Sequence, residues 1–254
     1  MFKLYLNSDN LIEFNGATDV AAIPQVPITG ATVTASLYDD AADAWIMAEE
    51  FVLSEDEAAA QVTLSVFGVP KVTVAIGDVV RIAQDDGTHH QTTIAAGSTT
   101  TTLVLAAGLA SAASKGKPVK LLSKALGVDT LRLDRVIPFE LGEQVSVDQD
   151  DGTKHITTVS DRDLSTNEIV LADVTTALVS VGNLVAQKIG ADVTMTQYGT
   201  PAANDNTWGY RGTIADTHAG LKLGQRVRAV INFNGGAGLQ REEYLYGRVQ
   251  NGGA

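Results

Sequence analysis

The amino-acid sequence predicts an all-β fold, and its composition, its alternating pattern and its turn signals each favour that class. Charged residues make up only 19% of the 254 residues, while 24 glycines and many threonines and valines suit turns and strands better than helices. Apolar and polar residues alternate with period two in short segments such as residues 79–84. The dipeptide Asp86-Gly87 follows that segment, and Asp-Gly is typical of a tight turn between two hairpin strands.

An internal repeat occupies the middle of the chain. The sequence GDVV at residue 77 is followed by QDDGT and TTI, and 65 residues later GEQV is followed by QDDGT and TTV. The two copies, residues 58–123 and 124–190, each hold four to six short strand patterns, which indicates a small SH3-like or other compact β-barrel. In the Ala-rich segment 106–115 we expect a short helix or a helical turn.

The segments that flank the repeats are predicted to form one further domain. Residues 1–57 and 191–254 both contain strand patterns, but neither segment has enough strands to close a core alone. Together they supply about seven strands with turn residues between them, which fits a β-sandwich. We therefore expect the two flanks to pair with each other and the repeats to lie outside their sheets, as an insertion.

Three segments of the flanks carry a family resemblance. They read ATVTASLYD at residues 31–39, GYRGTI at 209–214 and LGQRVRAVI at 223–231. In this order they resemble a family of small immunoglobulin-like proteins found among the head and neck genes of tailed bacteriophages, and the repeats resemble small barrels of phage structural proteins. The resemblance implies an immunoglobulin-like sandwich split by an insertion of two tandem small SH3-like β-barrels. In that family the first two segments lie close together, whereas here the repeats separate them, which leaves the position in the virion open.

The resemblance also implies a function. It points to a bacteriophage virion structural protein, such as a head decoration, head-fibre or neck component, that acts through protein–protein contacts. Its partners would be capsid, portal or tail neighbours and further copies of itself, with assembly in the bacterial host cytoplasm and final location in the virion. The alternative is a carbohydrate-binding or host-recognition adhesin module, because Trp208 and Tyr210 alternate onto one face of a strand; core packing explains the same pattern.

Charge and hydropathy argue against nucleic acid and membrane partners. The formal net charge is −12, which disfavours binding to duplex nucleic acid, and the most apolar stretch, 103–113, is about half as long as a membrane helix. The charge is uneven, since residues 1–60 hold eleven Asp/Glu and one Lys, while residues 208–254 hold six Lys/Arg and three Asp/Glu. Either chance and solubility explain this asymmetry, or the two ends of the chain contact each other within one molecule or head to tail.

The sequence offers little chemistry. It contains no cysteine, no Gly-x-Ser-x-Gly motif and no phosphate-binding loop. The carboxylate pairs Glu49-Glu50 and Glu55/Glu57 fall in an acidic, Ala-rich stretch that we expect to be solvated. His90 and His155 occupy equivalent repeat positions beside paired aspartates, so a divalent-cation site and a polar hairpin are both open, and we expect the hairpin. We predict no catalytic, cofactor-binding or metal-binding residues, and therefore no enzyme.

Overall fold

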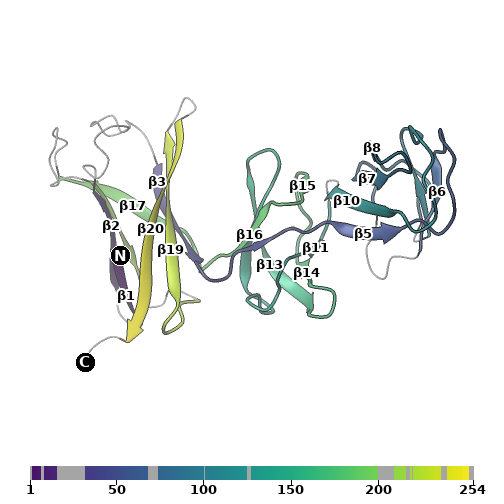
Figure 1. Cartoon of the computed structure of the whole chain (residues 1–254). Coiled ribbons are helices and arrows are strands. Elements are labelled where there is room, and N and C mark those ends of the chain that lie inside the picture. Colours follow the sequence, from purple (N-terminus) through teal and green to yellow (C-terminus); the bar gives the residue numbers. More distant parts are fainter. Residues whose placement is uncertain are drawn as a thin grey trace. The chain divides into compact units, whose positions relative to one another are not determined.

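The computed structural model confirms the all-β prediction (Figure 1). The 20 elements are all strands, and the part of the chain that the structure describes contains no helix. The chain divides into two compact units, unit 1 (residues 1–43 and 186–254) and unit 2 (residues 44–185). The described residues are 2–6, 9–15, 32–67, 74–99, 101–124, 127–199, 209–215, 218, 220–235 and 239–251.

Unit 1 contains one seven-stranded sheet to which both flanks of the chain contribute. Its strands follow the order β1 (Phe2–Leu6), β20 (Leu239–Asn251), β19 (Arg226–Gly235), β3 (Thr32–Asp39), β17 (Val193–Tyr198), β18 (Gly209–Ile214) and β2 (Asn10–Asn15). β1 lies parallel to β20, and the remaining pairs are antiparallel. The pairing of β3 with β19 and of β2 with β18 confirms that the flanks belong together.

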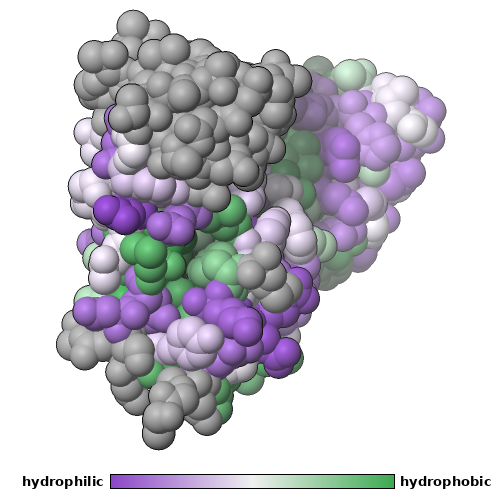
Figure 2. Space-filling model, turned by 90° about the vertical axis from the view of Figure 1, so that its left-hand side faces the viewer, coloured by the Kyte–Doolittle hydropathy of each residue, from purple (hydrophilic) through white to green (hydrophobic). Residues whose placement is uncertain are grey.

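One hydrophobic core supports this sheet. Alternate residues of each strand point inward, as the period-two pattern predicts, and Leu4 of β1 and Ile12 of β2 are both fully buried in the same cluster. Because β1 and β2 are the two edges of the sheet, the sheet must curl around that core. On the side of unit 1 that Figure 2 displays, hydrophobic residues gather in a central area between hydrophilic ones.

Unit 2 consists of two small barrels of the same strand order. In the second barrel the order is β4 (Ala44–Trp45), β16 (Leu184–Gln187), β12 (Gln144–Asp148), β13 (Lys154–Asp163), β14 (Glu168–Leu171) and β11 (Thr130–Arg132), and a bridge between Ile46 and Leu133 joins its edges. In the first barrel the corresponding order is β5 (Glu49–Val52), β10 (Pro118–Lys124), β7 (Val79–Ala83), β8 (His89–Thr93), β9 (Thr102–Val104) and β6 (Thr63–Ser65). Bridges Ile94–Leu105 and Leu53–Val66 complete that ring.

The predicted hairpin turns lie where the repeat places them. Gly87 joins β7 to β8 and Gly152 joins β12 to β13, with φ values of 82° and 81° that a side chain would strain. The barrels nevertheless begin earlier in the chain than the repeat suggested. Each takes its first strand from residues 44–53, so the units divide after residues 43 and 185 instead of at the predicted 57 and 190.

The expected helix at 106–115 is absent, because the backbone of this segment is paired with another segment. Leu109 exchanges backbone hydrogen bonds with Gln61 and Ala60, and Ala113 exchanges two with Glu57. Gly108 lies so close to the chain that a Cβ there would stand 2.4 Å from the carbonyl oxygen of Ala60. The alanines of the segment therefore allow a close approach to residues 57–61, and they do not form a helix.

Candidate functional site

The junction between the two barrels of unit 2 is the most distinctive site in the described residues. Strand β10 of the first barrel extends beyond that barrel, and its Ser123 and Lys124 pair with β15 (Val179–Ser180) of the second. The amide of Val181 adds a hydrogen bond to the carbonyl of Leu122. Residues 46–49 run in the other direction, from the second barrel into β5 of the first. Among the described residues, continuous strand pairing therefore joins the two barrels.

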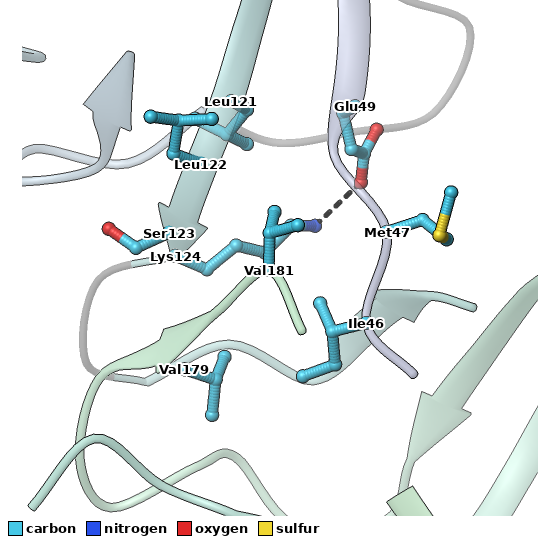
Figure 3. Close-up of a pocket in the computed structure, with 9 residues that line it drawn as sticks. All are labelled: Ile46, Met47, Glu49, Leu121, Leu122, Ser123, Lys124, Val179 and Val181. Atoms are coloured by element: carbon cyan, nitrogen blue, oxygen red, sulfur yellow. Dashed lines mark ion pairs between the residues drawn. The ribbon is translucent and has the colours of Figure 1, made fainter. Parts of the chain in front are cut away.

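A buried ion pair lies at this junction. Lys124 Nζ is 2.9 Å from Glu49 Oε1, and the two side chains are only 7% and 6% exposed. Figure 3 shows the two side chains reaching toward each other from their separate strands. Lys124 Nζ also donates a 2.9 Å hydrogen bond to the carbonyl of Thr130, in the second barrel.

The pocket around the ion pair is too small for an organic ligand. It has room for about one water molecule. Its walls are mostly aliphatic, and the residues that line it are Ile46, Met47, Glu49, Leu121, Leu122, Ser123, Lys124, Val179 and Val181. Such a site has a structural role. Removing one partner of a buried ion pair costs about 3–5 kcal/mol, so a movement of the barrels that separated these two desolvated charges would also be unfavourable.

In the first repeat, the aspartates that sequence analysis singled out fasten the hairpin to a neighbouring loop. Asp86 accepts hydrogen bonds from the Ser111 hydroxyl (2.6 Å) and from the amide and hydroxyl of Thr88. These bonds, with that of Ser111 the largest, lower the pKa of Asp86 from 3.8 to about 2. Asp85 accepts hydrogen bonds from the amide and hydroxyl of Ser114, which lower its pKa, and it lies 3.5 Å from Lys117.

The second repeat uses the same arrangement with different partners. Asp150 accepts hydrogen bonds from the Ser180 hydroxyl (2.6 Å) and the Asn183 amide (2.7 Å). Asp151 accepts from the hydroxyl and amide of Thr153, which lower its pKa. Ala177 is the structural equivalent of Ser111 in the first repeat, because the backbone carbonyl of each accepts a hydrogen bond from the side chain of the buried glutamine that precedes the aspartates. The shared motif is therefore explained by folding.

The repeat histidines are bound to backbone. The Nε2 atoms of His90 and His155 each lie 3.2 Å from a carbonyl oxygen, that of Ala107 and that of Asp173 respectively. Within the described ranges no three His, Asp or Glu side chains converge as metal ligands would. These contacts give each histidine ring a structural role. The absence of a bound metal at the hairpins stays a prediction.

The acidic stretch near residue 50 differs from its expected solvated state. Glu49 and Glu57 are buried, and Glu57 accepts a 2.7 Å hydrogen bond from the amide of Ser65. Glu50 and Glu55 have the expected exposed setting, and Glu50 lies 3.6 Å from Lys120. Sequence reasoning missed the junction because the partner of Glu49 is 75 positions away and no local signal links Glu49 to Lys124.

In unit 1, the structure bears on two alternatives that the sequence left open. Tyr210 is buried and packs edge to face on Phe233 with ring centroids 5.5 Å apart, so it belongs to the core, and burial raises its pKa. Trp208 lies outside the described residues. The acidic and basic ends of the chain meet within one molecule, since Arg226 lies 2.7 Å from Asp40 and Arg228 forms a bidentate pair with Asp43.

This chain matches no protein-family model and no curated protein. Among the described residues, no helix has the length and hydropathy that are needed to cross a lipid bilayer.

Proposed function

We propose that this chain is a structural protein of a tailed-bacteriophage virion, such as a head decoration, head-fibre or neck component, and that it acts by protein–protein contacts. In this proposal unit 1 is the immunoglobulin-like domain that attaches to the particle. The two SH3-like barrels of unit 2 form a stiff arm that contacts a capsid, portal or tail neighbour. The residue patterns at 31–39, 209–214 and 223–231 support the phage assignment, and all three contribute to the sheet of unit 1.

The observation that carries the proposal is the way the barrels are joined. Two barrels of one strand order share continuous strand pairing and a buried ion pair, which we expect to hold them together as one element. The polar residues of the repeated motif are engaged in hydrogen bonds that hold each barrel together. Such a duplicated element suits a spacer or a repeated contact surface, since two linked modules gain avidity without new contacts.

A carbohydrate-binding module remains the second candidate, and one surface feature favours it. Tyr244 and Tyr246 point to the same side of β20 and are 51% and 47% exposed. Exposed tyrosine rings suit stacking on sugars. A glycan array separates the two candidates, because a virion spacer gives no reproducible glycan signal and an adhesin loses its signal in a Tyr244→Ala/Tyr246→Ala variant.

Particle association is the direct test of the main proposal. Phage particles purified from the host should contain the full-length chain in many copies, as measured by quantitative mass spectrometry. A chain that is abundant in the lysate but absent from intact particles would contradict the proposal.

A deletion then locates the attachment. Replacing residues 44–185 with a short Gly/Ser linker should leave a folded unit 1 that still joins the particle, because the flanks share one core. If the truncated protein folds but stays in solution, attachment occurs through the barrels. If it does not fold, the insertion hypothesis is wrong.

A further inference from the structure

A row of cations crosses the outer face of the unit 1 sheet. The strand register places Lys3 of β1 opposite Arg248 of β20, and Arg248 opposite Arg226 of β19. β1, β20 and β19 are adjacent in the sheet, as Figure 1 shows. The residues that follow these three, Leu4, Val249 and Val227, are buried in the core, so the three cationic side chains lie on the opposite, solvent-facing side.

This arrangement is unfavourable for an isolated molecule. Like charges directly opposite each other on neighbouring strands destabilise a sheet. Asp40 offsets part of the charge through its ion pair with Arg226, whose side chain is nevertheless 68% exposed. Lys3 and Arg248 are also exposed. The row is notable because the chain as a whole carries a net charge of −12.

Exposed tyrosines adjoin the row. Tyr246 lies two residues before Arg248 on the same face of β20, Tyr244 follows in the same line, and Tyr5 lies on the same face of β1. Val230, which pairs with Tyr244 in the sheet, is almost fully buried on this side. Tyrosine and arginine are the residue types that most often supply the energy of protein interfaces. We call Lys3, Tyr5, Arg226, Tyr244, Tyr246 and Arg248 the cationic face.

The charge distribution of the chain indicates the partner. Unit 2 holds 19 Asp/Glu and 10 Lys/Arg, a net charge of −9, whereas the cationic face concentrates three positive side chains. A symmetric contact between two cationic faces would bring like charges together. We propose that the cationic face binds the acidic barrel pair of a second copy of this chain, so that copies associate head to tail. Such heterologous contacts generate rings or filaments. The contact itself does not depend on the proposed virion function, which supplies only the particle on which the copies would assemble.

Sedimentation velocity of the full-length chain tests the proposal. The wild-type protein should associate with rising concentration in 50 mM NaCl and dissociate in 500 mM NaCl, where charges are screened. Arg248→Glu should weaken association about tenfold or more. The same substitution removes the repulsion from Lys3 and Arg226, so its Tm should be equal to or above that of the wild type. Arg211→Glu, the same charge change at an exposed position of β18, which β3 and β17 separate from β19, should leave association unchanged.

A mixing experiment tests the choice of the barrels as occupant. A fluorescently labelled Arg248→Glu chain keeps intact barrels, so it should still sediment with an excess of unlabelled wild-type protein in 50 mM NaCl. Failure to co-sediment would overturn the head-to-tail contact, and a wild type that stays monomeric at every concentration would overturn self-association. Neither result depends on phage particles, so failure here is distinguishable from failure of the virion proposal.

Discussion

Replacing Lys124 with methionine should destabilise unit 2 far more than the same replacement of an exposed lysine in the barrels. The ammonium group lies 2.9 Å from Glu49 Oε1, and both side chains are more than nine-tenths buried. At that separation the Coulomb attraction is about 6 kcal/mol for an effective dielectric constant of 20, and much of it offsets desolvation. Lys124→Met leaves the Glu49 carboxylate buried without its partner, which should cost about 3–5 kcal/mol.

The neighbouring strand position supplies a matched control. Lys120 lies on the same strand, β10, and is 3.6 Å from Glu50 of β5, but these side chains are about half exposed. Lys120→Met should therefore cost less than about 1 kcal/mol. The double variant Glu49→Leu/Lys124→Met, which removes both charges, should recover most of the stability lost in Lys124→Met, because an apolar pair needs no compensating charge.

Urea unfolding of the full-length chain measures these differences. Trp45 lies in β4 of unit 2, close to the junction, so its fluorescence in a Trp208→Phe background reports the unfolding of unit 2. With a slope of about 2 kcal/mol per molar urea, the midpoint of Lys124→Met should fall by about 2 M. If Lys124→Met loses no more stability than Lys120→Met, the junction is not held by the ion pair and the rigid-arm argument fails.

Two further predictions concern the first barrel. Ser111→Ala removes the strongest hydrogen bond to Asp86, so the pKa of that carboxyl should rise from about 2 toward 3.8 in an NMR titration, with Asp151 as the unchanged internal reference. Because the pKa is lowered by folding, the stability that Asp86 contributes is present above about pH 4 and is lost as the pH falls toward 2; a wild-type pKa near 3.8 would contradict this. Gly108→Ala should cost about 2 kcal/mol or more, since its Cβ would meet backbone at Ala60, and a Tm decrease smaller than about 2 °C would argue against that close approach.

The repeated motif allowed much of unit 2 to be anticipated from the sequence. The Asp-Gly turns were predictable because a local dipeptide determines positive φ at Gly87 and Gly152. The first strand of each barrel was not predictable, because residues 44–53 carry no copy of the motif and pair with strands that follow more than 60 residues later. The helix expected at 106–115 failed for the same reason, since alanine content says nothing about a distant backbone partner.

The candidate site was harder to predict than the fold. A glutamate in an acidic stretch reads as solvated, and only the long-range pairing of β5 with β10 brings Glu49 next to Lys124. The charge asymmetry of the chain was visible, and its intramolecular interpretation is correct for Asp40, Asp43, Arg226 and Arg228. The cationic face could not be seen in the sequence, because it depends on the parallel register of β1 on β20.

The order of the strands along the chain has a consequence for synthesis on the ribosome. The last strand of the first barrel ends at Lys124, that of the second barrel at Gln187, and that of the unit 1 sheet at Asn251. Each domain can therefore be completed only after the domain inserted in its sequence has been synthesised. At about 5–20 residues per second, the second barrel closes roughly 3–13 seconds after the first. Strand β3 must wait still longer for β19, about 190 residues downstream. We therefore expect the first barrel to fold first, the second barrel next, and the sheet of unit 1, which carries the cationic face, last.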